Sequence, residues 1–272
     1  MRTQQRDRRG GKPDTRTKPG SKWGAHVEHL FGRNAVREAL SGRRHHHLLT
    51  FADGIRWDKR LYEMRSLAES RQISIEMAPR QLLDDIVDEG RHQGVVLRTS
   101  AYPYVEYQDL PRQGRPVLLL DHLQDPQNFG SLLRSAEAFG VTGVIIPRDR
   151  SGEITPAVVN ASAGAVEHQF IARVTNLGRT IDDLKESGYW IVGLDRTAIS
   201  QPLDDFDPPN PVALVVGAEG KGLTASVSAQ CDILVSIDQV GQIDSLNASV
   251  AGSIALFHLT RKFRNQYIQS RK

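Results

Sequence analysis

The chain has 272 residues, of which 39% are hydrophobic and 25% are charged, and its one cysteine is Cys231. These proportions predict a water-soluble globular protein of one large or two ordinary domains. They exclude an internal disulfide framework and a cysteine-rich zinc site. No apolar run is long enough to span a bilayer and the N-terminus has no apolar signal region, so we expect a cytoplasmic protein.

The positive charge of the chain is concentrated at its beginning. The whole chain carries a formal charge of +3 and residues 1–24 carry +6, which leaves −3 for residues 25–272. Residues 1–24 have almost no aliphatic side chains, so they bury too little apolar surface to fold alone. We predict a disordered basic tail, which either keeps the chain soluble or holds nucleic acid through its phosphates.

Short strand-like runs alternate with helical stretches in the next part of the chain. This order predicts a small α/β domain over residues 25–100, and the three prolines of residues 101–116 predict a linker. The expected helices are 33–42, 59–70 and 79–90, and the expected strands are 46–53, 72–77 and 94–99.

A second α/β block follows over residues 117–272. Its first strand, "PVLLLD", is almost continuously aliphatic, which is typical of a buried parallel strand. The expected strands are 116–121, 143–147, 168–174, 189–195, 212–217 and 232–237, and the expected helices are 128–140, 176–188 and 245–263.

Clusters of polar residues follow three of these strands. They are "DHLQDPQNFGSLLR" (121–134), "GAEGKG" (217–222) and "DQVGQIDSLN" (238–247). Because ligands bind outside the carboxyl ends of strands in open α/β sheets, the three clusters predict one shared site.

Several common nucleotide and metal sites do not fit these clusters. Residues 121–130 lack the glycine triad of a dinucleotide site, and Gly220-Lys221 is followed by Gly222 rather than the hydroxyl residue of a P-loop. No G-x-S-x-G motif occurs, and we expect no bound metal. The triplet His45–His47 is interpreted as incidental or RNA-facing rather than metal-binding.

Two of the expected helices carry polar side chains at positions where a buried helix would carry apolar ones. Ser245, Asn247 and Ser249 stand at the start of the most apolar helix, where they either cap its free N–H groups or meet a ligand. Asn128 has the same two options at the start of its own helix. Arg134 lies off the apolar stripe of that helix, where it either forms a surface ion pair or faces a cleft.

Residues 121–134, 217–222 and 245–251 resemble, in order and at the right strand exits, the three motifs of the SpoU (TrmH) RNA 2′-O-methyltransferases. The segments "LFGRNAVREAL" (30–40) and "HQGVV" (92–96) resemble the L30e-like substrate-binding domain of the RlmB-like subgroup, which methylates guanosine in 23S rRNA. The resemblance implies a SPOUT-type trefoil-knotted α/β methyltransferase domain over 117–272, preceded by an L30e-like RNA-binding domain over 25–100. It further implies S-adenosylmethionine as cofactor and a homodimer whose site draws on both subunits.

The resemblance also implies roles for individual residues. Gly217, Ile237 and Leu246 would contact S-adenosylmethionine, largely through their backbone. The catalytic group would comprise Asn128, Arg134, Glu219, Ser245 and Asn247.

The motif-one arginine, Arg134, is often described as the base in this family. A guanidinium is effectively always protonated, so we expect Arg134 to act instead as a cation beside the developing alkoxide. Glu219 is expected to orient its neighbours. Asp238, where relatives often carry proline, and Asp244 depart from the family pattern.

Other functions remain open at this point. The acceptor could be a tRNA ribose, or the rRNA adenosine methylated by antibiotic-resistance relatives. The chain could also be a catalytically silent RNA-binding or ribosome-assembly protein, or a nucleotide-binding enzyme of another kind. The presence of Asn128, Arg134, Glu219 and Asn247 favours an active enzyme.

Overall fold

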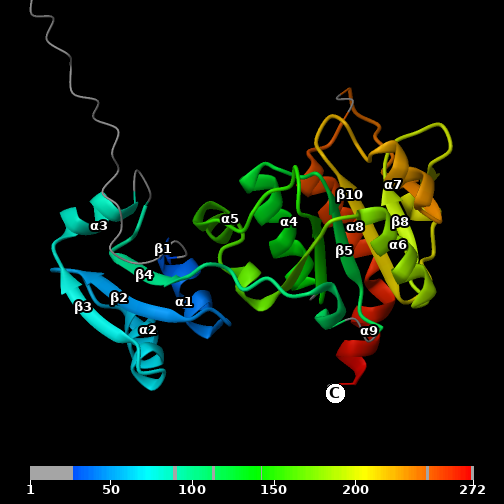
Figure 1. The fold of residues 1–272 in the computed structure, drawn as a ribbon. Coiled ribbons are helices and arrows are strands. Elements are labelled where there is room, and N and C mark those ends of the chain that lie inside the picture. Colours follow the sequence, from blue (N-terminus) through cyan, green and yellow to red (C-terminus); the bar gives the residue numbers. More distant parts are fainter. Residues whose placement is uncertain (1–26, 88–90, 112–113, 142, 243–244, 271–272) are drawn as a thin grey trace, which may run out of the picture.

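The computed structural model describes residues 27–87, 91–111, 114–141, 143–242 and 245–270 (Figure 1). The predicted basic tail over 1–24 lies outside these residues. Within them the chain forms a four-stranded and a seven-stranded sheet. The helices of the described part are not long and apolar enough for any of them to cross a membrane.

The smaller sheet has the strand order β1-β4-β2-β3. Strand β4 runs antiparallel to both β1 and β2, whereas β2 and β3 are parallel. Three helices connect the strands. The elements are β1 (Val27–Phe31), α1 (Arg33–Ser41), β2 (His46–Ala52), α2 (Lys59–Ser70), β3 (Ser74–Ala78), α3 (Arg80–Val87) and β4 (Val95–Ser100).

The larger sheet is parallel throughout and has the strand order β7-β6-β5-β10-β8-β11-β9. Strand β10 therefore enters between β5 and β8, and β11 enters between β8 and β9. Its elements are β5 (Val117–Asp121), α4 (Pro126–Ala138), β6 (Gly143–Pro147), α5 (Pro156–Ala161), β7 (Phe170–Val174), α6 (Leu177–Glu186), β8 (Trp190–Leu194), β9 (Gln201–Pro202), β10 (Val212–Gly217), α7 (Ala225–Gln230), β11 (Ile233–Ser236), α8 (Ala248–Leu259) and α9 (Arg261–Gln269).

Helices cover both faces of the larger sheet, as expected for buried parallel strands. Leu118 and Leu120 of β5 belong to the hydrophobic cluster that contains α4 and α8. Leu119, between them in the chain, belongs to the cluster that contains α6 and α7. Successive side chains of a strand point to opposite faces, so one aliphatic strand supplies both cores. The predicted α/β fold class is confirmed.

Two helices differ from their predicted bounds for identifiable reasons. Helix α4 begins at Pro126 rather than 128, because Asp125 caps it by accepting a hydrogen bond from the backbone N–H of Asn128 at 2.8 Å. The predicted helix 245–263 begins only at Ala248, because Asn247 is its N-cap, and it is divided at Thr260, whose φ of −86° and ψ of 2° depart from helical values, so that α8 and α9 are separate helices.

Candidate active site

The carboxyl ends of β8, β10 and β11 open into a cavity of about 270 Å³, hereafter the first cavity. The residues after these strands line it together with the first residues of α8. A second cavity of about 680 Å³ lies at the carboxyl end of β5 and is lined by 121–125, Asn128, Arg150 and the 218–225 segment. The three polar clusters of the sequence thus come together at one edge of the sheet.

The loop 217–222 forms the wall between the two cavities, since Ala218, Glu219 and Gly222 line both. A Cβ atom on Gly217 would lie 2.2 Å from the backbone carbonyl carbon of Gly222, so any side chain there would push the loop out of place. Gly220 and Gly222 have φ of 75° and 64°, values that glycine adopts without strain. This turn holds Glu219 between the cavities.

Glu219 is joined to both other motifs by a relay of side-chain hydrogen bonds. The Nδ2 of Asn128 donates to Oε2 of Glu219 at 2.8 Å, and the Nδ2 of Asn247 donates to Oδ1 of Asn128 at 2.7 Å. A carboxylate only accepts, so the order of donors along the relay is fixed by Glu219. Asn128 is 8% exposed, and its amide hydrogen bonds are therefore shielded from water.

Asn247 is also the N-cap of α8. Its Oδ1 accepts from the backbone N–H groups of Ser249 and Val250 at 3.0 and 3.3 Å. Capping and site contacts thus use different atoms of one amide. At α4 the two tasks are divided between residues, because Asp125 caps the helix and leaves the Asn128 side chain free for the relay.

The remaining predicted site residues lie in different places. Gly217, Ile237, Leu246 and Ser245 all line the first cavity with Glu219. Arg134 lines neither cavity; it is exposed on α4 and makes no hydrogen bond or ion pair within the part of the chain that the structure describes. One chain therefore brings together every predicted site residue except Arg134.

Asp195 follows β8 and lines the first cavity, although none of the three motifs indicates it. Its Oδ1 accepts from the backbone N–H of Arg196 at 2.8 Å and lies 2.9 Å from a Cβ placed on Gly222. The signal was present in "YWIVGLDR", because Asp195 and Arg196 are polar residues at a strand exit like those of the three motifs.

Asp121 connects the end of β5 to the start of α7. Its Oδ2 accepts from both the backbone N–H and the hydroxyl of Thr224, at 2.7 and 2.8 Å, and its Oδ1 lies 2.5 Å from Nδ1 of His122. Asp121 is buried, and its contacts fix the two segments that form the second cavity.

Of the two aspartates that depart from the family pattern, the structure describes only Asp238. Asp238 is exposed and does not line the first cavity, and Asp244 lies outside the described residues. In the histidine triplet, burial and the nearby Arg71 and Arg44 lower the pKa of His46 to about 4, so this side chain is neutral at physiological pH.

Known proteins resemble most of this chain. The profile of the SpoU rRNA methylase family matches residues 115–257, and the profile described as "RNA 2′-O ribose methyltransferase substrate binding" matches residues 29–105. YacO of Bacillus subtilis, named as a putative TrmH family tRNA/rRNA methyltransferase, is 39% identical over 241 residues, which span 86% of this chain and 96% of that protein.

Two solved structures are similar in fold. The AdoMet-bound rRNA methyltransferase from Sinorhizobium meliloti has a TM-score of 0.73 and 25% identity over 87% of this chain and 88% of that chain. The SpoU methyltransferase AviRb from Streptomyces viridochromogenes, in complex with AdoMet, has a TM-score of 0.73 and 23% identity over 88% and 92% of the two chains.

Proposed function

We propose that the acceptor of this protein is a ribose 2′-hydroxyl, specifically of a guanosine in 23S rRNA. The proposal starts from the family: this chain belongs to the SpoU rRNA methylase family and is an S-adenosylmethionine-dependent RNA methyltransferase. The observation that carries the methyl transfer is the relay from Glu219 through Asn128 to Asn247, which joins three separate motifs at the wall between two cavities. The guanosine of 23S rRNA is supported by the resemblance of residues 30–40 and 92–96 to the RlmB-like subgroup. The match of residues 29–105 to a 2′-O ribose methyltransferase substrate-binding profile supports the ribose acceptor. We further propose a cytoplasmic protein.

The first cavity fits S-adenosylmethionine by the chemistry of the residues that line it. Leu246 and Ala251 give it apolar walls for an adenine ring, while the carboxylates of Asp195 and Glu219 complement a sulfonium cation. Gly217 and Ile237 would offer backbone groups at the strand ends. When bound, the cofactor supplies an electrophilic methyl group on sulfur.

The residues around the second cavity would then hold the acceptor nucleotide beside the wall. Arg150 and Lys221 line this cavity and would attract phosphates, while Asn128 and Glu219 would orient the ribose. Because Asn128 is held at both ends, the relay needs no rearrangement on binding. Such positioning supplies up to ~7–11 kcal/mol of the barrier in favourable intramolecular cases.

We propose that the active form is a homodimer with a trefoil knot in each chain. The insertion of β10 and β11 between strands formed earlier in the chain supports the knot. Val250, Ile254 and Phe257 form an apolar stripe on α8 and are 47%, 42% and 54% exposed, which supports a partner chain on this helix.

The homodimer also gives Arg134 a role. Ser135, the next residue on α4, accepts a hydrogen bond from Ser253 of α8 at 2.7 Å, and Ile254 follows in the exposed stripe. Arg134 therefore lies beside the proposed interface. We propose that the Arg134 side chain reaches the site of the partner chain. There its guanidinium group stabilises the developing alkoxide and binds the adjacent phosphate.

The test uses the full chain, tritiated-methyl S-adenosylmethionine, and protein-free 23S rRNA, 16S rRNA and tRNA side by side. Alkali cannot cut beside a 2′-O-methyl ribose, so label in an alkali-resistant dinucleotide that begins with methylguanosine, from 23S rRNA alone, is the expected result. Asn128→Ala serves as the control for contaminating activity. Label only in tRNA would overturn the 23S rRNA assignment, and label released by alkali as a mononucleotide would overturn the ribose acceptor.

A further inference from the structure

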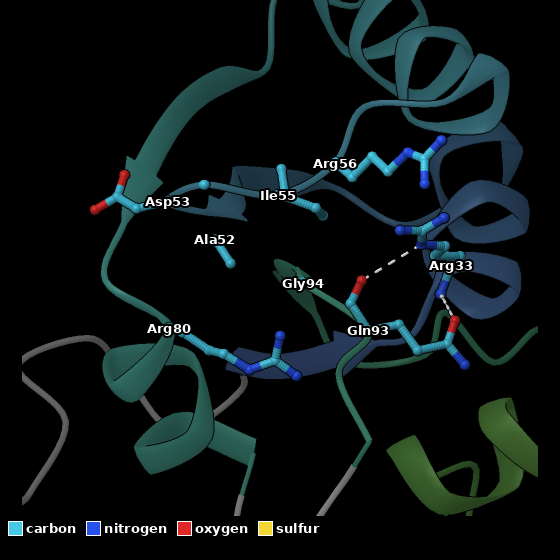
Figure 2. A pocket seen from close by; sticks show the side chains of 9 residues that line it. Arg33, Ala52, Asp53, Ile55, Arg56, Arg80, Gln93 and Gly94 are labelled. Carbon is cyan, nitrogen blue, oxygen red and sulfur yellow. Dashed lines mark hydrogen bonds between the residues drawn. The ribbon is translucent and has the colours of Figure 1, made fainter.

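A hollow of about 520 Å³ on the smaller domain gathers arginines from three elements, far along the chain from the methyltransferase motifs. Arg33 begins α1, Arg56 lies in the loop after β2, and Arg80 begins α3 (Figure 2). Among the residues that the structure describes, Asp53 is the one acidic residue that lines it, and its carboxylate points away from the three guanidinium groups (Figure 2). We call this site the arginine hollow.

The backbone at the floor of the arginine hollow is tightly specified. Gln93 and Gly94 have φ of 53° and 81°, and a Cβ on Gly94 would lie 2.4 Å from Cδ1 of Ile55. The ring of His92 pins the same loop, since its Nδ1 accepts from the N–H of Gly94 at 2.9 Å and its Nε2 lies 2.9 Å from Oδ1 of Asp84. A bulkier residue than Gly94 would close the floor against Ile55.

The three arginines are held differently. Arg33 is fixed by an ion pair with Asp58 and by its Nε, which donates to the carbonyl of Gln93 at 3.4 Å. Arg56 and Arg80 are exposed and make no hydrogen bond or ion pair within the described part of the chain. Gathering unpaired cations costs electrostatic free energy unless an anion joins them, and a guanidinium fork matches a phosphate.

The shape of the surrounding surface distinguishes a polymer from a small anion. A neighbouring hollow, of about 270 Å³, shares Arg33 and Gln93 with the arginine hollow and adds Arg91. It extends to Asn160 and Ala163, which belong to the larger domain at and after α5. The hollowed surface therefore continues from the arginine hollow past Arg91 to neutral residues of the larger domain, a length that suits an extended polyanion better than a small one.

We propose that the arginine hollow binds backbone phosphates of the RNA substrate and so aligns the RNA with the methyltransferase site. The inference rests on the proposed function, because it assumes that RNA is the acceptor. Arg56 and Arg80 would contact the phosphates directly, and Arg33, held by Asp58, would form the fixed end of the site.

The experiment compares full-length proteins for binding to protein-free 23S rRNA over a series of KCl concentrations. The test variant is Arg56→Ala/Arg80→Ala, and Lys59→Ala/Arg65→Ala is the matched control. The control removes two cations from α2 of the same domain, and these pair with Glu63 and Glu69 rather than line the hollow. Arg56→Lys/Arg80→Lys tests whether charge alone restores binding.

We expect the test variant to bind at least about tenfold more weakly, and its log–log salt slope to fall by about 1.4–1.8, since each lost phosphate contact removes ~0.7 on a single strand or ~0.9 on a duplex. The control should keep the wild-type slope and the Lys variant should largely recover it. In turnover, KM for RNA should rise while kcat and S-adenosylmethionine binding stay unchanged. Equal slopes and affinities for test and control would overturn this inference alone, provided that the wild type methylates RNA. A wild type that methylates no RNA would overturn it together with the proposed function.

Discussion

Asn128 uses both ends of its amide, so replacing it with a charged isostere should create a conflict that depends on pH. In Asn128→Asp the new carboxylate would face Glu219 across the 2.8 Å now spanned by a hydrogen bond. Two adjacent carboxylates raise the pKa of the pair, and the folded state then binds a proton more tightly than the unfolded state. The folded Asn128→Asp protein is therefore least destabilised at low pH, where the pair holds a proton, and it loses stability as the pH rises and the pair ionises.

We predict that the melting temperature of Asn128→Asp, relative to wild type, falls between pH 5 and pH 8. Asn128→Ala removes the hydrogen bonds without adding charge, so its melting temperature should differ from wild type by the same amount at both pH values. Differential scanning calorimetry measures both variants. Identical pH profiles for the two would show that the introduced carboxylate does not face Glu219.

The charge of Arg134, rather than proton removal by its side chain, should decide activity. A lysine keeps the charge but not the planar fork, so we predict that Arg134→Lys retains activity within about tenfold of wild type, whereas Arg134→Ala loses on the order of 10²-fold or more, as expected for a lost electrostatic contact. Single-turnover methylation of RNA measures both. A loss in Arg134→Lys as complete as in Arg134→Ala would contradict a purely electrostatic role.

The spacing of apolar residues along the chain predicted the bounds of some helices and strands and gave no signal for others. Strands β6 and β10 and helix α2 have the predicted bounds because each carries a strong local signal, aliphatic or amphipathic. Helices α5 and α7 have six residues each, too few for a clear period, and they were missed. Strand β1 was missed because it is an edge strand in which only Leu30 is fully buried.

The site shows the same division between local and long-range information. Motif order placed Asn128 and Glu219 at two strand exits, but the contact between them joins residues 91 positions apart in the chain. Only the strand order of the sheet, with β5 beside β10, brings those exits together. The sequence predicted helix α4, and the spacing of its apolar residues placed Arg134 off the buried face. That spacing did not decide whether Arg134 faces a cavity of its own chain.

Helix α8 presents an apolar stripe that a second chain would cover. We predict that Ile254→Glu, at a residue that is 42% exposed, converts the protein from dimer to monomer, because a buried interface charge without a partner is costly. Leu82→Glu, on α3 of the smaller domain and 46% exposed, is the matched control and should leave the dimer intact. Sedimentation equilibrium distinguishes the two masses; a dimeric Ile254→Glu would place the interface elsewhere.

The two domains are locked together by a buried ion pair. The side chain of Arg44 is fully buried, its Nε lies 2.9 Å from Oε1 of Glu167 in the larger domain, and its Nη1 lies 2.5 Å from Oε2 of Glu28. Tyr102 lies against the same guanidinium, whose carbon is 5.3 Å from the centre of the tyrosine ring. Burial raises the pKa of Glu167, and Arg44 opposes this effect. Arg44 is thus the buried cation of this junction, which Arg43 also joins by donating to the carbonyl of Gln169 at 2.8 Å.

We predict that Arg44→Ala lowers the free energy of unfolding by about 3–5 kcal/mol, because it leaves Glu167 buried without a partner. The pKa of Glu167 would rise further, so the loss should grow as pH rises from 5 to 8, where the unpaired carboxylate must ionise. Arg44→Met/Glu167→Leu removes the buried pair and leaves only Glu28, whose side chain is 22% exposed, so its loss should be smaller than that of Arg44→Ala and should not grow with pH. Urea unfolding at pH 5 and pH 8 measures the free energy of unfolding of each variant. A small, pH-independent decrease in that free energy for Arg44→Ala would mean that water reaches Glu167.

Two inactive variants offer the strictest test of a site shared between chains. If each site uses Asn128 of one chain and Arg134 of its partner, a mixed dimer of Asn128→Ala and Arg134→Ala holds one intact site and one doubly defective site. Co-refolding equal amounts makes half the dimers mixed, so activity should recover to about one quarter of wild type, given a two-fold symmetric dimer. If both residues serve the same chain, every site in the mixture keeps one defect and no activity returns. Adding Ile254→Glu to both chains should abolish the recovery, because complementation requires the α8 interface.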